Sequence, residues 1–150
     1  MRKIVDLIDL VLDKLLLAFF VVMTAAIVWQ VFARYVLAAP TIWSEELARF
    51  LLVWITMLGS ASVIGRGDHI AVTVFVEMTP APVQRALGFL RDALVIGMAG
   101  FLAYYGAGFA ASGSRRISTG LHLSMGYVYL AIPVGAVLIA LTLLFRHRDR

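Results

Sequence analysis

The sequence contains no cysteine, few charged residues and only three histidines. The absence of cysteine excludes disulfides, thiolate nucleophiles and thiolate metal sites. Charged residues make up 15% of the 150 positions, whereas about a quarter is usual in a soluble domain. Apolar residues make up 62%, and the mean hydropathy is +0.94. A soluble core of this size cannot bury so much apolar surface, so the sequence predicts an integral membrane protein that lipid covers.

The three histidines argue against catalysis, because His69, His122 and His147 all lie at the ends of apolar segments. A membrane cytochrome needs histidines that face one another within the bilayer, so a haem anchor for a redox enzyme is disfavoured. No HExxH, GxSxG or P-loop motif occurs. We predict no enzyme activity, no cofactor, no metal site and no catalytic or substrate-binding residue. The net charge of +4 is spread over many short segments, which indicates membrane topology and no nucleic-acid partner.

Four apolar segments are long enough to cross a bilayer, which takes roughly 20 residues. They run over about 15–37, 43–65, 83–112 and 121–145. Between residues 2 and 14, apolar residues recur at helical spacing with the charges on the other face. This pattern predicts an amphipathic interfacial helix that turns, or runs on, into the bilayer. The predicted fold class is an all-α membrane protein, with one four-helix transmembrane domain over residues 1–150 and this N-terminal helix.

Membrane orientation follows from the positive charges. Nine of the 13 Lys and Arg residues fall on the side that holds both termini and the middle loop. The positive-inside rule places that side in the cytoplasm, so the first and third loops face the exterior. In the middle loop, residues 70–78 are rich in apolar side chains, and we favour a short interfacial helix there over an extended segment.

A charged cluster begins the second span, at Trp43-Ser44-Glu45-Glu46-Leu47-Ala48-Arg49-Phe50. The length of the span predicts that Arg49 lies one to two turns below the exterior interface. Glu45 at i−4 and Glu46 at i−3 are both able to pair with it. Arg34, near the outer end of the first span, is a second cation within reach of the same carboxylates.

The start of the second span also carries capping and anchoring residues. Thr41 or Ser44 can cap the helix, and Trp43 suits an interfacial anchor. Two interpretations therefore stay open. The cluster is either a self-sufficient helix start or a polar contact with a partner.

Small residues gather in two spans. Gly59-Ser60-Ala61-Ser62 lies in the second, and the third has nine Gly and Ala residues between positions 97 and 111. Small residues let membrane helices approach closely, either within the chain or at a docking face for a partner membrane protein. In the fourth span, Pro133 with Gly135 nearby predicts a mild kink.

Transport by this chain alone is disfavoured. Ion-coupled carriers usually hold a charged group near the middle of the membrane. No charged residue occurs between Asp92 and Arg115 or between His122 and Arg146, and the first span has no carboxylate after Asp13. The alternative function is a stand-alone small transporter or channel that oligomerises through its Gly and Ala faces.

Five motifs in order give the sequence a resemblance to a known family. It resembles the small membrane subunit of tripartite ATP-independent periplasmic (TRAP) transporters, a four-helix subunit. The motifs are Phe32-Ala33-Arg34-Tyr35-Val36, then Trp43 to Arg49, then Trp54 with Gly59, then Arg66-Gly67-Asp68-His69-Ile70, and Ile132-Pro133-Val134-Gly135. The stretch from Ala71 to Arg116 offers little to match.

The resemblance implies a role and partners. In such transporters a soluble periplasmic protein captures an organic acid, and a large membrane subunit moves it with the sodium gradient. The small subunit packs against the large one as a fixed scaffold in the bacterial or archaeal cytoplasmic membrane, among the membrane lipids, and can touch the binding protein. The expected structural and partner-interface residues are Arg34, Trp43, Glu45, Glu46, Arg49, Trp54, Gly59, Arg66, Asp68 and His69.

Overall fold

The computed structural model describes residues 2–66 and 81–148. All of its named elements are helices: α1 (Arg2–Tyr35), α2 (Ile42–Arg66), α4 (Ala81–Gly113), α5 (Met125–Tyr129) and α6 (Ala131–Arg148). Four stretches of helix are long and apolar enough to cross a membrane: Asp9–Tyr35, Ile42–Ile64, Pro82–Gly113 and Met125–Leu144. The prediction of an all-α membrane protein with four spans is confirmed.

Residues 2–35 form one uninterrupted helix, so the N-terminal segment runs on into the first span, which is one of the two arrangements that the sequence allows. Its position at the interface stays a prediction. One predicted boundary differs clearly from the observed one. The fourth span does not begin at Leu121, because residues 121–124 belong to a loop and helix starts at Met125. The segment 70–78, together with Asp68 and His69, lies outside the described residues.

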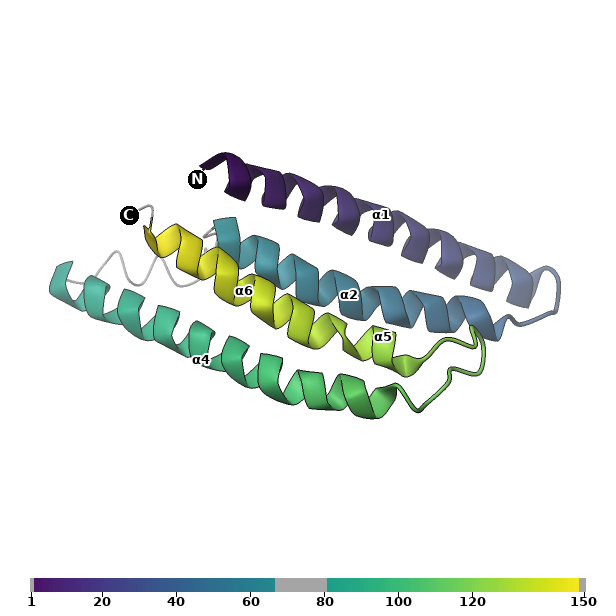
Figure 1. Ribbon diagram of the computed structural model, residues 1–150. Coiled ribbons are helices and arrows are strands. Elements are labelled where there is room, and N and C mark those ends of the chain that lie inside the picture. Colours follow the sequence, from purple (N-terminus) through teal and green to yellow (C-terminus); the bar gives the residue numbers. More distant parts are fainter. Residues whose placement is uncertain (1, 67–80, 149–150) are drawn as a thin grey trace.

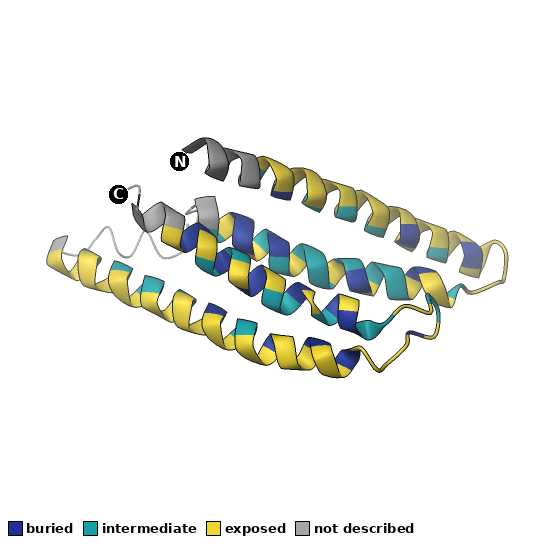
Figure 2. Ribbon diagram, in the orientation of Figure 1, coloured by how far each residue is buried: buried dark blue, intermediate teal, exposed yellow. Residues whose placement is uncertain are grey.

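The long helices lie side by side in one row. α1 packs on α2, α2 on α6, and α6 on α4, as Figure 1 shows. In the candidate spans, 22% of the residues of α2 and 39% of those of α5–α6 are buried. For α1 and α4 the share of buried residues is 6% each. The exposed residues in Figure 2 accordingly dominate the two edge helices. Both edge helices present wide apolar surfaces that the described parts of the chain leave uncovered.

Glycines let the inner helices approach closely. A Cβ atom on Gly135 of α6 would lie 2.7 Å from the Cβ atom of Met57 on α2. A Cβ atom on Gly106 of α4 would lie 2.9 Å from a methyl carbon of Ile132 and 3.1 Å from the Cδ atom of Pro133. Without an apolar driving force between helices in lipid, this close packing is what holds the row together.

The opposite face of α4 also carries glycines. A Cβ atom on Gly97, Gly100 or Gly108 would meet no neighbouring side chain or helix within 4 Å, so that face is open. Packing within the chain therefore accounts for one face of α4, and a docking role of the open face stays a prediction. Gly106 and the buried Ala99 serve packing within the chain.

The fourth span is interrupted near its proline. α5 ends at Tyr129, Leu130 forms a turn, and α6 begins at Ala131. Pro133 has no N–H to donate to the Tyr129 carbonyl four residues earlier, which is the usual cause of such a break. Backbone hydrogen bonds from Leu130 to Gly126 (2.9 Å) and from Val134 to Leu130 (3.1 Å) keep the two helices in line.

A candidate interaction site at the loop end

The candidate site lies at the end of the row where α1 joins α2 and α4 joins α5. We call this region the loop end and define it as residues 36–41 and 114–124. The first turn of α2 lies between the two loops. The Thr41 and Ser44 hydroxyl oxygens are 2.6 Å apart, and the Ser44 hydroxyl also donates to the Thr41 carbonyl at 3.1 Å. Ser44 is fully buried, so this polar pair closes the helix start without needing water.

The two adjacent acids of α2 have different partners. Arg49 donates to the Oε1 atom of Glu45 at 2.8 Å, one helical turn away. The side chains of the pair are 66% and 51% exposed, so no other described part of the chain covers them. Of the two pairings that the sequence leaves open, the structure has the one with Glu45. Among the described residues, no ion pair joins Arg34 to either acid.

Glu46 instead binds the loop between α4 and α5. Its Oε2 atom accepts hydrogen bonds from the Ser118 hydroxyl and from the backbone N–H groups of Gly120 (2.9 Å) and Leu121 (3.1 Å). Its Oε1 atom accepts from the Thr119 hydroxyl at 2.9 Å. Four donors thus surround one carboxylate, and bonds to a charged acceptor are stronger than neutral ones. We call this arrangement of Glu46 with residues 118–121 the Glu46 clasp.

Gly120 lets the loop lie directly on the first turn of α2. A Cβ atom at this position would be 2.9 Å from the Glu46 Oε2 atom and 2.9 Å from the Trp43 backbone nitrogen. His122, two residues later, has a φ angle of 55°, which turns the chain back toward α5. Any side chain at position 120 would therefore push the loop away from the carboxylate.

The sequence does not predict the clasp, because local spacing offers Glu46 only Arg49, Arg34 or another protein as a contact. Its donors lie more than 70 positions further along the chain. The available signal was the tripeptide Ser118-Thr119-Gly120 in an exterior loop, because two hydroxyls and a glycine amide are typical donors to a carboxylate. Assigning residues 121–124 to a membrane span concealed part of that loop.

The other predicted interface residues are spread along the row. Arg34 and Trp43 are exposed at the loop end. Trp54 packs edge-to-face on Phe19 of α1, with ring centroids 6.5 Å apart. Gly59 faces α1, where a Cβ atom would meet Leu16 at 3.9 Å. Arg66 is the last residue of α2, at the end opposite the loop end.

A second charged pair lies in α4, toward the end opposite the loop end. Arg91 donates to the Asp92 carboxylate through two nitrogens, at 2.6 and 2.9 Å. From Arg91 to Gly113 at the end of α4, the helix rises by about 33 Å. This distance matches a hydrocarbon core of about 30 Å. α4 is therefore long enough to project beyond the core by its first ten residues or to tilt within it.

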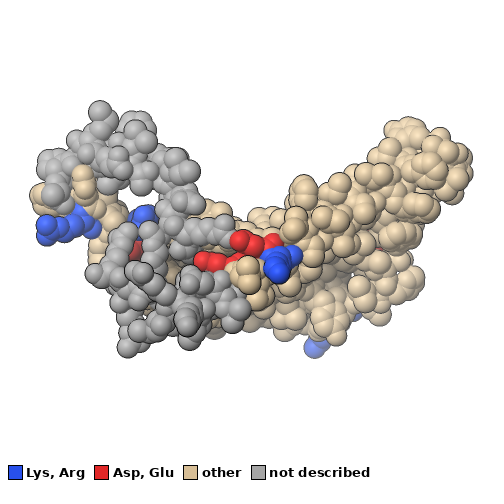
Figure 3. All heavy atoms as spheres, turned by 90° about the horizontal axis from the view of Figure 1, so that it is seen from above, with Lys and Arg blue, Asp and Glu red and all other residues tan. Residues whose placement is uncertain are grey.

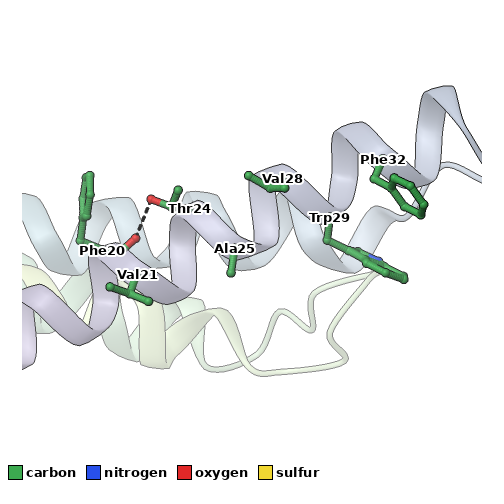
Figure 4. Close-up of a pocket in the computed structure, with 7 residues that line it drawn as sticks. All are labelled: Phe20, Val21, Thr24, Ala25, Val28, Trp29 and Phe32. Carbon is green, nitrogen blue, oxygen red and sulfur yellow. Dashed lines mark hydrogen bonds between the residues drawn. The ribbon is translucent and has the colours of Figure 1, made fainter.

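An apolar groove runs along the exposed side of α1. It has a volume of about 580 Å³ and is lined by Phe20, Val21, Thr24, Ala25, Val28, Trp29 and Phe32, which Figure 4 draws as sticks. The Thr24 hydroxyl donates to the Phe20 carbonyl at 2.8 Å, so the one polar side chain near the floor already has an acceptor. The groove offers apolar contact and no chemistry.

The geometry suits protein contact and membrane anchoring. Within residues 2–66 and 81–148, no group of three His, Cys, Asp or Glu side chains is placed to hold a metal ion. Figure 3 shows that charged atoms form a few small groups on the face in view, whereas uncharged residues cover most of its described surface. The fold and the site thus define a multi-pass membrane protein whose charged side chains, among the described residues, lie toward the ends of its helices.

Comparison with known families identifies the class more closely. Residues 23–148 match the family model for the DctQ component of tripartite ATP-independent periplasmic transporters. The match covers most of the chain, so the protein belongs to this family, and the resemblance that the five motifs indicate is confirmed. The chain is a small permease subunit of the TRAP type and a multi-pass protein of the bacterial inner membrane.

Individual relatives agree with this assignment. The chain is 28% identical to the sialic acid TRAP transporter small permease protein SiaQ of Vibrio cholerae over 91% of its own length and 78% of the relative's. It is 35% identical to the C4-dicarboxylate TRAP transporter small permease protein DctQ of Rhodobacter capsulatus, over 65% and 44%. It also matches 19% of the sialic acid TRAP transporter permease protein SiaT of Haemophilus influenzae, at 25% identity over 79% of this chain. All three are named as transporter components and none as an enzyme.

Proposed function

We propose that the chain is the accessory scaffold subunit of a sodium-coupled TRAP importer of organic acids and packs against the large transport subunit. The observation that carries this proposal is the low burial of the edge helices, 6% in the candidate spans of α1 and α4. Sialic acid and C4-dicarboxylates, for which relatives are named, are both organic acids. The expectation of sodium coupling rests on the family resemblance.

The open face of α4 supports a protein neighbour rather than lipid alone. Tyr104 and Tyr105 are 76% and 60% exposed there. Tyr104 lies nine residues before Gly113, or about 14 Å into the hydrocarbon from the loop end. Among the described residues neither hydroxyl has a hydrogen-bond partner. A bare hydroxyl in hydrocarbon is costly, so a neighbouring transmembrane helix that accepts from it is favoured.

The absence of charge from the middle of the spans supports a static role. Between Lys14 and Arg34, between Arg49 and Arg66, and between Asp92 and Arg115, the sequence has no Asp, Glu, Lys or Arg. A subunit without a charged group near the middle of the membrane has no evident means of coupling ion movement to transport. The positive-inside rule puts both termini in the cytoplasm and the loop end in the periplasm, where it is able to meet the soluble binding protein.

Reconstitution tests the proposal. The chain and its large permease subunit are incorporated in proteoliposomes and the soluble binding protein is added outside. Uptake of labelled sialic acid and C4-dicarboxylates is then measured under a sodium gradient. We expect uptake to require all three components. Full uptake without the small subunit would overturn the proposal, and solute flux through the small subunit alone would establish the alternative of a stand-alone transporter.

A further inference from the structure

The loop between α4 and α5 is a structured element. Its two halves are joined by the Ser118 N–H to the Leu123 carbonyl and by the Met125 N–H to the Arg116 carbonyl, both at 2.9 Å. Ile117 and Ser124 form an antiparallel bridge. The Ser124 hydroxyl also donates to the Ser114 carbonyl at 3.1 Å. The loop is thus closed on itself before the Glu46 clasp adds its four hydrogen bonds.

The clasp fixes where this closed loop lies. The loop's own hydrogen bonds set its shape, and the contacts with Glu46 and with the first turn of α2 hold it against the neighbouring helix. Ser118 is buried in this contact, with 2% of its surface exposed. The clasped side of the loop is therefore occupied, and the other side is free to face outward.

The outward side carries two cations and one large apolar side chain. Arg115 and Arg116 are exposed, and Ile117 is 70% exposed. Among the described residues, neither arginine has an acidic partner, because Glu45 pairs with Arg49 and Glu46 binds the loop. We call these three residues the basic edge.

Such an edge is unexpected at this place in a membrane protein. Arginine is disfavoured in short exterior loops, and two in succession weaken the charge difference that sets the topology. Arginines that only bind lipid phosphates need no fixed backbone, because long side chains reach the headgroups from a flexible loop. A fixed backbone matters for a protein partner, because it reduces the ordering cost of association and holds the contacts in register. Arginine is also enriched in protein interfaces.

We propose that Glu46 is a positioning residue that holds the basic edge, Arg115, Arg116 and Ile117, as a preformed docking site for an acidic surface patch on the soluble periplasmic binding protein. This inference rests on the proposed function, because it assumes that the loop end faces the periplasm. It goes beyond that function in naming the contact residues and the charge of the partner's surface.

Binding to the assembled complex tests the edge. The small and large subunits are placed together in phosphatidylcholine nanodiscs and titrated with the fluorescently labelled soluble binding protein of the same transporter. The double variant Arg115→Glu with Arg116→Glu should weaken binding at least about tenfold, mainly through slower association, and should reduce its salt dependence. The reversal lowers the exterior positive charge, so it preserves the topology. Arg85→Glu, at the far end of α4, is the matched control and should leave binding unchanged.

The clasp is tested separately with Glu46→Gln. This variant keeps the basic edge but puts an amide N–H₂ group where a carboxylate oxygen accepts, so the loop loses its fixed position. We expect faster dissociation, an unchanged salt dependence, and faster hydrogen exchange of the Gly120 and Leu121 amides. Glu45→Gln, at the neighbouring position, should leave all three unchanged.

Two results would overturn the inference. One is an affinity that changes less than about twofold in the double arginine variant. The other is a double arginine variant that binds normally but is no longer stabilised by anionic lipid, as judged from the melting midpoint in phosphatidylglycerol discs. The basic edge would then be an anchor to lipid headgroups. Failure of the wild-type subunits to associate would instead overturn the proposed function. The edge would still be judged in that case, by titrating discs that hold the small subunit alone.

Discussion

The middle of the helix row and its loop end are held together by different interactions. In the middle, backbones approach at glycine positions, as at Gly135 against Met57, and the buried residues there are mostly small and apolar. At the loop end, a carboxylate accepts four hydrogen bonds from a loop more than 70 residues away in sequence. Lipid surrounds the first region and water reaches the second.

This difference predicts how each region responds to a defect. An added methyl group between two closely packed helices forces their backbones apart, because an interior packed at this density has little free volume. A hydrogen bond lost at the loop end is partly replaced by water, so its net contribution is smaller than its strength in isolation. Substitutions in the middle should therefore cost more than substitutions at the loop end.

The largest expected effect is that of Gly135→Ala. Alanine favours helix by about 1 kcal/mol over glycine, but its Cβ atom would lie 2.7 Å from that of Met57, so α2 and α6 have to separate. Overpacking of this kind costs about 1–3 kcal/mol. The midpoint of thermal unfolding in detergent, followed by tryptophan fluorescence, should fall, and so should the yield of complex with the large subunit.

Gly100→Ala is the matched control for that substitution. It adds the same methyl group to a helix in the row, but nothing lies within 4 Å of it. The isolated subunit should be as stable as wild type or slightly more so, because only the gain in helix propensity acts. Equal losses of stability in both variants would contradict the role of close approach in the middle of the row.

A smaller effect is expected at the loop end from Glu46→Ala. The variant leaves the Ser118 and Thr119 hydroxyls and the Gly120 and Leu121 amides without their shared acceptor. Hydrogen exchange of the two amides should increase markedly, and the melting midpoint should fall by less than in Gly135→Ala. Glu45→Ala removes an exposed pair on the same turn and should leave the amides protected. Unchanged protection in Glu46→Ala would mean that the loop holds its position without the clasp.

A still smaller effect is expected for the Arg49 pair. Both side chains are more than half exposed in the isolated subunit, and an ion pair that water reaches contributes about 0–1 kcal/mol. Arg49→Lys should keep part of the attraction to Glu45 and stay closer to wild type than Arg49→Ala. The difference should shrink further at high salt, which the melting midpoint will register. A large loss in Arg49→Ala within the complex, absent from the isolated subunit, would instead indicate contact with a partner.

Sequence predicted those parts of the fold and site that depend on local spacing. The four spans follow from apolar length, and the pair between Glu45 and Arg49 is one of the two pairings that helical spacing allows. The Glu46 clasp could not be predicted in this way, because it joins residues whose proximity depends on how α2 packs beside α5 and α6. For the same reason, composition could not tell which glycines of α4 face α6 and which face outward.

The smallest expected effect is a gain from Ala38→Gly in the loop between α1 and α2. Ala38 has a φ angle of 50°, a conformation that costs an alanine about 1–2 kcal/mol and a glycine almost nothing. Glycine also loses more entropy on folding, so the net gain should be below about 1 kcal/mol. Ala39→Gly is the control, because the neighbouring residue has no such angle and the substitution should be neutral or destabilising. A melting midpoint that falls in Ala38→Gly as well as in Ala39→Gly would mean that this loop does not adopt the left-handed turn in the membrane. α1 and α2 would then be joined by a loop of another conformation while still packing on one another.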